Sequence, residues 1–330
     1  MSGANDRLNH VLHALLVGQS KWTRVLAAGL NEHTDVNADA IPIDTASDAL
    51  KLLSPARFRR ADVIMRVGFR PGAHTIRGRV FDAIFDMMRP ATTPVVYYWL
   101  GTDVLNARHD ADAGIDQRRF RSMAAAATHL ADSDALRDDL AALGVKATTA
   151  WLPAPNAPQE GEIVDLPEQF TVLTYVPNSR SAFYDGPTMI EVAKRLPDVR
   201  FRVAGGTGSW IDDAPANIEF LGWRHDMGEL YDTSSVLVRL LEHDSVSCMA
   251  VEALAHGRPV IYSRDFPNAI HVEYQDADGL EAALRRLVET ASRGEIAVTP
   301  DTVAWARTIS EPRACYDEIS NALHQIAGLR

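Results

Sequence analysis

Runs of apolar residues alternate with amphipathic segments along the chain. In the first half most apolar runs are continuous, which is typical of strands buried on both faces of a parallel sheet. The expected strands there are residues 10–17, 36–43, 61–67, 94–100, 128–132 and 147–152. The segments between them favour helices, expected at residues 22–32, 76–88, 115–126 and 134–143. Leu136, Leu140 and Leu143 are three and four positions apart, so they share one helix face.

A proline-rich segment separates this series from a second one. Residues 152–167 contain Pro153, Pro155, Pro158 and Pro167, and prolines this dense exclude a helix and interrupt strands. Beyond this linker, strands are expected at residues 170–176, 200–204, 218–221, 236–240 and 259–262. Helices are expected at residues 184–196, 227–231, 248–256, 280–290 and around 311–329.

The alternation of strands and helices predicts an α/β protein with two Rossmann-like, doubly wound domains. We expect an N-terminal domain over residues 1–155, a C-terminal domain over residues 156–305, and a terminal helix over residues 306–330 that packs back toward the N-terminal domain. Ligands of such sheets bind beyond the carboxyl ends of the strands, so the sequence predicts a central cleft that both domains face.

The composition narrows the class of protein. Of 330 residues, 46% are hydrophobic and 23% are charged, as in packed globular proteins. The net charge of -11 argues against a nucleic-acid partner, which needs a basic surface. Two cysteines, Cys248 and Cys315, cannot form a disulfide framework or a zinc cluster. We find no secretory signal and no apolar run of about 20 residues, so we expect a cytoplasmic protein.

One local charge feature departs from this average. The stretch from Lys51 to Arg89 holds many basic residues and few acids. Its basic residues are Lys51, Arg57, Arg59, Arg60, Arg66, Arg70, Arg77, Arg79 and Arg89. Two interpretations are open. The patch either contacts an anionic surface, such as the inner face of a membrane or a phosphate-bearing acceptor, or it is a set of solvated helix faces.

The most informative stretch is 236–263. A buried strand ends near Leu241, a polar acidic turn follows, a helix begins near Ser247, and Gly257 ends that helix. Backbone amides at a helix start bind phosphate oxygens, and here they belong to Ser247, Cys248 and Met249. Glu252 can accept hydrogen bonds from ribose hydroxyls, and Asp244 can contact a donor sugar. Alternatively, Ser247 is an ordinary N-cap and Glu252 only complements the helix dipole.

This stretch resembles the donor-binding motif of family-four-type retaining glycosyltransferases with the GT-B fold. Asp244, seven intervening residues and Glu252 are followed by the sequence Ala-Leu-Ala-His-Gly-Arg-Pro-Val. The first acid is Asp where the family usually has Glu, and Ser247 stands where the family has Gly. The resemblance implies transfer of a sugar from a nucleotide-diphosphate sugar, with UDP or GDP as the nucleotide part, no further cofactor, no metal, and a saccharide or lipid-linked acceptor.

Other segments match the same family in order. The resemblance places Gly205 and Gly206 beside the ligand, and Gly222, Trp223 and Arg224 beside the nucleobase. Trp223 either stacks on the base or only packs. In the N-terminal half, Gly18 and Gln19 correspond to the glycine loop on the acceptor side.

Three polar residues have less certain roles. Asp103 follows a buried strand and a glycine, and it is either an acceptor-binding residue or general base in the cleft, or a turn aspartate. His243 lies in the acidic turn, where it can touch the donor sugar. His13 is expected to be a core histidine on the first strand.

One departure from the family concerns the diphosphate. The family usually has an arginine and a lysine after the first strand of the C-terminal domain. Here Arg180 can supply the arginine, but the lysine position is Tyr184 or Asp185. Either Arg239 or a residue of the N-terminal domain compensates, or the chain is a non-catalytic partner that binds a nucleotide. A nucleotide-sugar epimerase is a further alternative.

Overall fold

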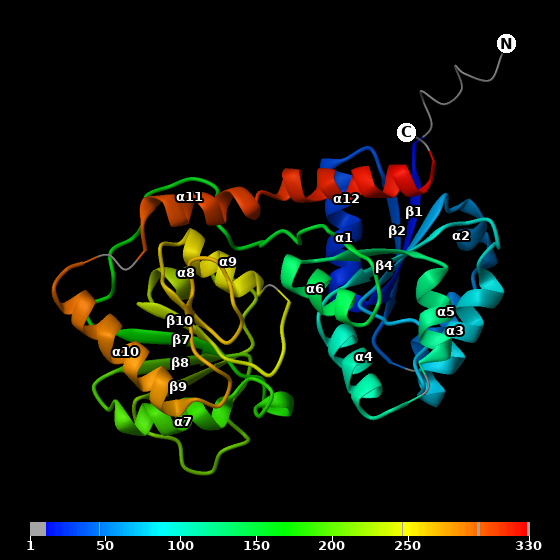
Figure 1. Cartoon of the computed structure of the whole chain (residues 1–330). Helices are drawn as coiled ribbons and strands as arrows, with labels where there is room; N and C mark the ends of the chain where they lie inside the picture. The colour runs from blue at the N-terminus through cyan, green and yellow to red at the C-terminus, as the bar shows by residue number, and fades with distance from the viewer. Residues whose placement is uncertain (1–10, 46, 116, 246, 296–297, 329–330) are drawn as a thin grey trace. The chain divides into compact units, whose positions relative to one another are not determined.

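The computed structural model describes residues 11–45, 47–115, 117–245, 247–295 and 298–328, and it divides into two compact units (Figure 1). Unit 1 consists of Met1–Leu152 and Pro312–Arg330, and unit 2 consists of Pro153–Glu311. Residues 1–10, where no secretory signal is expected and where the first expected strand begins, lie outside the described residues.

Unit 1 is built around a six-stranded parallel sheet with the order β2-β1-β3-β4-β5-β6. Its strands are β1 (His13–Gln19), β2 (Asn37–Ile43), β3 (Val63–Val67), β4 (Val95–Trp99), β5 (Thr128–Ala131) and β6 (Thr148–Thr149). Its helices are α1 (Ser20–His33), η2 (Ser47–Leu52), α2 (Pro55–Arg60), α3 (Ile76–Met88), α4 (Thr102–Asp112), α5 (Arg118–Ala125), α6 (Asp134–Ala142) and α12 (Pro312–Ile326).

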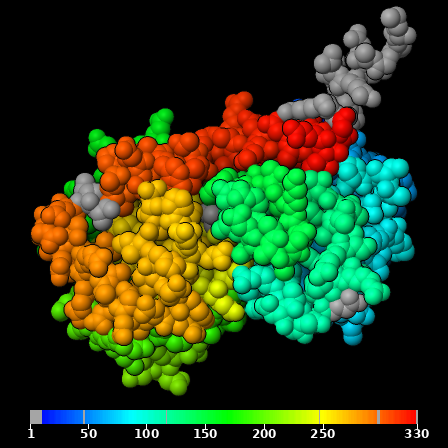
Figure 2. Space-filling model, in the orientation of Figure 1, coloured from blue at the N-terminus to red at the C-terminus, as the bar shows by residue number. Residues whose placement is uncertain are grey.

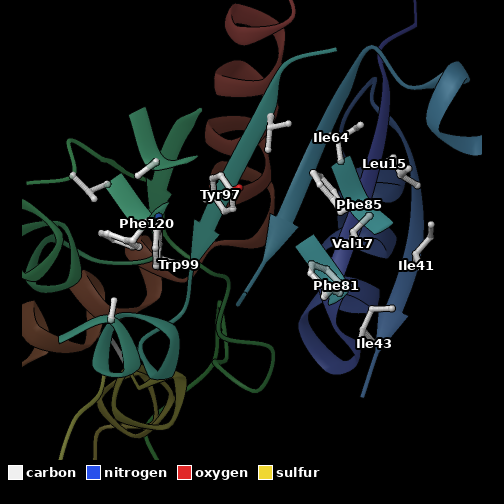
Figure 3. Close-up of a cluster of buried hydrophobic side chains, with 14 of the residues drawn as sticks. Leu15, Val17, Ile41, Ile43, Ile64, Phe81, Phe85, Tyr97, Trp99 and Phe120 are labelled. Atoms are coloured by element: carbon white, nitrogen blue, oxygen red, sulfur yellow. The ribbon is translucent and has the colours of Figure 1, made fainter. Parts of the chain in front are cut away.

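Both faces of the unit 1 sheet are covered. On one face, Phe81 and Phe85 of α3 point at the strands beside Ile64, as Figure 3 shows. On the other face, α1 and α12 pack together, and α12 contributes Ile319 and Leu323. Each such side chain contributes about 1.5–3 kcal/mol when it is fully buried. Burial on both faces explains why the strand sequences are continuously apolar.

Unit 2 repeats this plan with the strand order β12-β11-β10-β7-β8-β9, again all parallel. Its strands are β7 (Thr171–Tyr175), β8 (Arg200–Ala204), β9 (Ile218–Gly222), β10 (Val236–Arg239), β11 (Val260–Tyr262) and β12 (Ile270–His271). Its helices are η3 (Asn178–Arg180), α7 (Gly186–Arg195), α8 (Gly228–Asp232), α9 (Cys248–Ala255), α10 (Ala277–Ser292) and α11 (Pro300–Ile309). Helix α10, whose segment is orange in Figure 2, contributes the buried Leu280, Leu284 and Leu287 to a core against α7 and the sheet.

The two parallel sheets with helices confirm the expected α/β class, and each expected strand coincides with an observed one within its described residues. The elements that the pattern missed are short or polar: η2, α2, α4, η3, β12 and α11. The interpretation of His13 as a core residue was wrong. His13 is the first residue of β1, and its side chain is exposed although its neighbours Leu12 and Ala14 are buried.

Candidate functional site

The predicted donor residues gather at the carboxyl edge of the unit 2 sheet. Strands β7, β10 and β11 are parallel neighbours, so the loops that follow them leave the sheet at the same edge. The loop after β7 carries Arg180, and the loop after β10 carries His243 and Asp244 and leads into α9. The linear motif therefore folds into one local region.

Helix α9 begins at the end of the acidic turn. Ser247 has an extended conformation, and its carbonyl oxygen accepts hydrogen bonds from Ala250 N and Val251 N at 2.8 and 3.3 Å. Its hydroxyl makes no capping hydrogen bond, so the interpretation as an ordinary N-cap is not supported. Cys248 and Met249 form the first turn, where the amides carry the positive end of the helix dipole.

Asp244 lies between a cation and a phenol. Its Oδ2 is 3.5 Å from Nη2 of Arg239, and its Oδ1 accepts a hydrogen bond from Ser245 N at 3.1 Å. Burial acts to lower the pKa of Arg239, but the Asp244 carboxylate and the neighbouring Tyr184 and Tyr262 together outweigh it, so the pKa is raised. Burial, and then the same carboxylate, raise the pKa of the Tyr262 hydroxyl well above its usual value. His243, in the same turn, is also buried.

Glu252 is buried on α9, and its carboxylate accepts hydrogen bonds from other protein groups. Its Oε1 accepts hydrogen bonds from Asn156 N and Asn156 Nδ2 at 3.2 and 3.1 Å, and its Oε2 accepts one from the Tyr231 hydroxyl at 2.5 Å. Burial, and then the Glu252 carboxylate, raise the pKa of Tyr231 well above its usual value. The carboxylate therefore fixes the linker residue Asn156 and α8 to the start of α9.

Aromatic rings line the loop after β7. Arg180 is exposed, and its Cζ lies 3.8 Å from the centre of the Phe183 ring and 5.7 Å from that of Tyr184. Tyr184 in turn meets Tyr175, at the end of β7, edge to face with ring centres 5.3 Å apart. Asp185 adopts a left-handed conformation with φ 49, and its Oδ2 accepts a hydrogen bond from Gln275 N at 2.8 Å.

The glycines after β8 allow close approach of the backbone. Gly205 has φ +90, and a Cβ at Gly206 would lie 2.5 Å from the Val176 carbonyl oxygen. Gly222 ends β9, and Trp223 and Arg224 follow it as exposed side chains. Trp223 is 58% exposed, and its ring lies at 77° to the ring of Tyr175 with ring centres 6.4 Å apart. The residue therefore packs through part of its ring while much of its surface is accessible.

The residues predicted for the acceptor side lie in unit 1. Gly18 is in β1, where an added Cβ would lie 2.0 Å from the Val67 carbonyl oxygen, and Gln19 Nε2 donates to Gly68 O at 3.0 Å. Asp103 is buried at the start of α4 and accepts hydrogen bonds from Leu100 N and Val104 N at 3.1 and 3.0 Å. Burial raises the pKa of Asp103 to about 6 despite these hydrogen bonds. These contacts are those of a turn aspartate.

A cavity of about 810 Å³ at this edge of unit 1 contains residues that the sequence did not single out. Gln19 and Asp103 line it together with a polar cluster, in which Asp110 Oδ2 lies 2.5 Å from Arg70 Nη2 and 2.8 Å from His74 Nδ1. His74 and Asp110 are 36 positions apart, so no local pattern could have revealed the pair. The cluster gives the cavity a charged wall among apolar side chains.

Comparison with known proteins identifies the kind of protein that this chain resembles. Residues 187–290 match the family model described as glycosyl transferases group 1. No curated protein sequence matches the chain. The matched segment contains Asp244, Glu252 and the start of α9, but not Arg180 or unit 1.

Solved structures resemble nearly the whole chain. The crystal structure of Anabaena HepE in complex with UDP and glucose has a TM-score of 0.66 at 15% identity, covering 95% of this chain and 99% of that one. Sucrose-phosphate synthase from Thermosynechococcus elongatus has a TM-score of 0.65 at 13% identity, covering 95% and 98%. The lipopolysaccharide outer core galactosyltransferase WaaB has a TM-score of 0.63 at 10% identity, covering 95% and 99%. Together with the family match, these structures confirm the predicted resemblance to GT-B glycosyltransferases.

Two features are absent from the described residues: a membrane-spanning helix and a cluster of metal-binding side chains. No described helix is long and apolar enough to cross a membrane. The described part of the chain also holds no group of three or more His, Cys, Asp or Glu side chains placed to bind a metal ion.

Proposed function

We propose that this chain is a glycosyltransferase that transfers a sugar from a nucleotide-diphosphate sugar to an acceptor hydroxyl. The observation that carries the proposal is the start of α9, where the Ser247 hydroxyl makes no capping hydrogen bond. Asp244 precedes this helix start and Glu252 follows it, and all three residues lie in the segment that matches group 1 glycosyltransferases. In HepE, a protein of the same fold, the crystal structure contains UDP and glucose. UDP or GDP is the nucleotide part that we propose for this chain.

In this proposal named residues bind each part of the nucleotide-sugar donor. The amides of Ser247, Cys248 and Met249 and the Arg180 guanidinium bind the diphosphate, because a helix start and a cation both stabilise the charge that grows as the sugar leaves. Asp244 orients the sugar hydroxyls. Glu252 accepts hydrogen bonds from the ribose hydroxyls, and its hydrogen bonds from Asn156 and Tyr231 fix the carboxylate in place.

We further propose a retaining reaction without a metal ion. The bond from the anomeric carbon to the diphosphate oxygen breaks, the acceptor oxygen bonds to the same face, and the leaving phosphate takes the acceptor proton. A general base would favour inversion instead, and Asp103 was the candidate. Both Leu100 N and Val104 N donate to its carboxylate, which favours a structural role for Asp103.

We also propose that unit 1 contacts an anionic membrane that carries a lipid-linked acceptor. Helix α3 buries Phe81 and Phe85, yet it also has an exposed apolar stripe with helical spacing. The stripe consists of Ile76, Val80, Ala83 and Met87. Beside it, η2 packs against α3 and exposes Leu50 and Leu53.

The charge of this surface fits the same partner. Lys51, Arg77 and Arg79 are exposed within or next to the stripe, although the whole chain carries a net charge of -11. Apolar side chains ringed by cations favour the interface of an anionic bilayer. Ile76 and Val80 also line the unit 1 cavity, so an acceptor headgroup at the membrane would lie next to it.

Nucleotide binding and donor turnover test this function in two steps. We expect a rise in melting temperature with UDP or GDP, since a ligand that binds only the folded state stabilises it. We then expect slow hydrolysis of the matching sugar nucleotide and faster transfer with an acceptor. Nucleotide binding without hydrolysis or transfer would instead support a non-catalytic binding partner, and formation of an epimer without acceptor would support an epimerase. Absence of any nucleotide binding would refute the proposal.

A further inference from the structure

Arg239 is a buried cation at the carboxyl end of β10 whose role the sequence left open. It is 9% exposed, and an ionised side chain in that setting costs several kcal/mol unless partners compensate. Its ion pair with Asp244 is long, at 3.5 Å. Its Nε and Nη1 atoms are buried and make no hydrogen bond within the described part of the chain. A buried guanidinium with two such nitrogens favours the binding of an anionic ligand.

Arg239 and Arg180 approach the same aromatic ring. The Cζ atom of Arg239 is 4.9 Å from the centre of the Tyr184 ring, and that of Arg180 is 5.7 Å from it. The two guanidinium carbons are therefore at most 10.6 Å apart. Each hydrogen bond from a guanidinium to a phosphate oxygen spans roughly 3 Å. One diphosphate can therefore bridge both cations across the face of Tyr184.

The loop after β7 supplies no second cation of its own. Asp185, a candidate for the position of the family's lysine, is 2% exposed and directs Oδ2 to Gln275 N. Strand β10 is the hydrogen-bonded neighbour of β7, so a side chain at its carboxyl end reaches the same edge of the sheet. Arg239 occupies that place.

We propose that Arg239 is the second cation of the donor diphosphate site, and that the diphosphate takes the place of Asp244 beside it. This inference rests on the proposed function. When the diphosphate binds, Asp244 loses its cation and becomes free to accept hydrogen bonds from the donor sugar. Binding of the diphosphate and orientation of the sugar are thereby coupled through one ion pair. No covalent bond changes in this step.

Calorimetry on the full chain with UDP, UMP, GDP and GMP tests the assignment. Arg239→Met keeps the length of the side chain and removes its charge, so we expect a 10- to 100-fold loss of affinity for the diphosphate and a few-fold loss for the monophosphate. Arg239→Lys should recover part of the affinity. The matched control is Arg202→Met, which removes an equal charge from β8, where Arg202 bonds Thr233 Oγ1 at 2.8 Å. We expect that control to bind both nucleotides as the wild type does.

A second variant tests the exchange itself and does not depend on how well Arg239→Met folds. In Asp244→Asn the competing carboxylate is neutral, so we expect UDP or GDP to bind at least threefold tighter while sugar transfer falls. Equal or weaker binding of the diphosphate in Asp244→Asn would overturn the exchange. An unchanged ratio of UDP to UMP affinity in Arg239→Met would overturn the assignment of Arg239 but leave the proposed function intact. If the wild type bound no nucleotide, the proposed function would fail first.

Discussion

The two units share one architecture, but a buried charged side chain at the carboxyl edge of each sheet is held in a different way. At this edge of unit 2, the buried cation Arg239 has nitrogens that lack hydrogen bonds among the described residues. At the corresponding edge of unit 1, the buried residue Asp103 is an acid whose oxygens accept backbone hydrogen bonds. A parallel sheet provides the edge in both cases, and the side chains of the loops decide what binds there.

The comparison also separates two uses of a carboxylate. Asp244 is half-buried beside a guanidinium, so a ligand can compete for it. Asp103 has no such cation among its hydrogen-bond partners, and burial raises its pKa to about 6. The first arrangement suits ligand binding, and the second suits a fixed turn. The following predictions test this contrast, beginning with the largest expected effect.

Glu252→Ala should have the largest effect, because it removes the acceptor of a ribose hydroxyl and of three protein hydrogen bonds together. We expect donor affinity to fall at least 100-fold, since each buried hydrogen bond to a charged group is worth roughly 1.5–3 kcal/mol. Titration calorimetry with UDP and GDP measures the loss.

The controls separate ligand binding from support of the fold. Tyr231→Phe and Asn156→Ala each remove part of the protein network of Glu252 and leave the carboxylate in place. We expect both to lower the melting temperature and to reduce nucleotide affinity far less than Glu252→Ala. Nucleotide affinity that is equal in all three variants would assign Glu252 a purely structural role and remove the contrast between the two edges.

The unit 2 site could be predicted because its chemistry is contiguous in the sequence. Asp244, Ser247 and Glu252 lie within nine positions, and a strand, a turn and a helix in that order fix their geometry. The hydrogen bonds of Glu252 to Asn156 and Tyr231 could not be predicted, since they join residues 96 and 21 positions apart. The groups that donate hydrogen bonds to a carboxylate depend on which segments the fold brings beside it.

Unit 1 shows the opposite situation. The apolar runs predicted its strands, because burial on both faces leaves a clear pattern, but α4 has no clear apolar face and was missed. Its cavity is walled by Arg70, His74 and Asp110, which come from separate segments. The interpretation of Asp103 as a base was open in the sequence, because a glycine followed by an aspartate fits a turn and an active site equally well. Only its backbone partners distinguish the two.

A smaller effect should appear in the pH dependence of stability of Asp103→Asn. A carboxyl whose folded pKa is about 6, against an ordinary value of 3.8, binds more protons in the folded state between these values. The wild type therefore loses stability as the pH rises from about 4 to 6, by about 2–3 kcal/mol for a buried group. Asn keeps an oxygen for Leu100 N and Val104 N but does not ionise, so this loss should disappear.

Urea unfolding of both proteins at pH 4, 5, 6 and 7 measures the difference. We expect Asp103→Asn to gain stability relative to the wild type across this range, whereas Asp103→Ala should be less stable at pH 4 because it lacks the acceptor. Parallel curves for the wild type and Asp103→Asn would show that Asp103 does not carry a raised pKa. A large loss of transfer activity in a stable Asp103→Asn protein would restore Asp103 as a base.

The smallest effect concerns the exposed apolar stripe of α3 in unit 1. We expect Val80→Asn to weaken binding to vesicles of phosphatidylglycerol and phosphatidylcholine by up to about tenfold, because one apolar side chain inserted into a bilayer contributes on the order of 1 kcal/mol. Val80 is 49% exposed, and Val164 of unit 2 is 50% exposed, so Val164→Asn removes a matched apolar surface. Flotation of both variants, with pure phosphatidylcholine vesicles as reference, measures the difference.

Equal losses in the two variants would mean that the α3 stripe has no special affinity for lipid. The cations around it would then be solvated helix faces, and unit 1 would take its acceptor from solution.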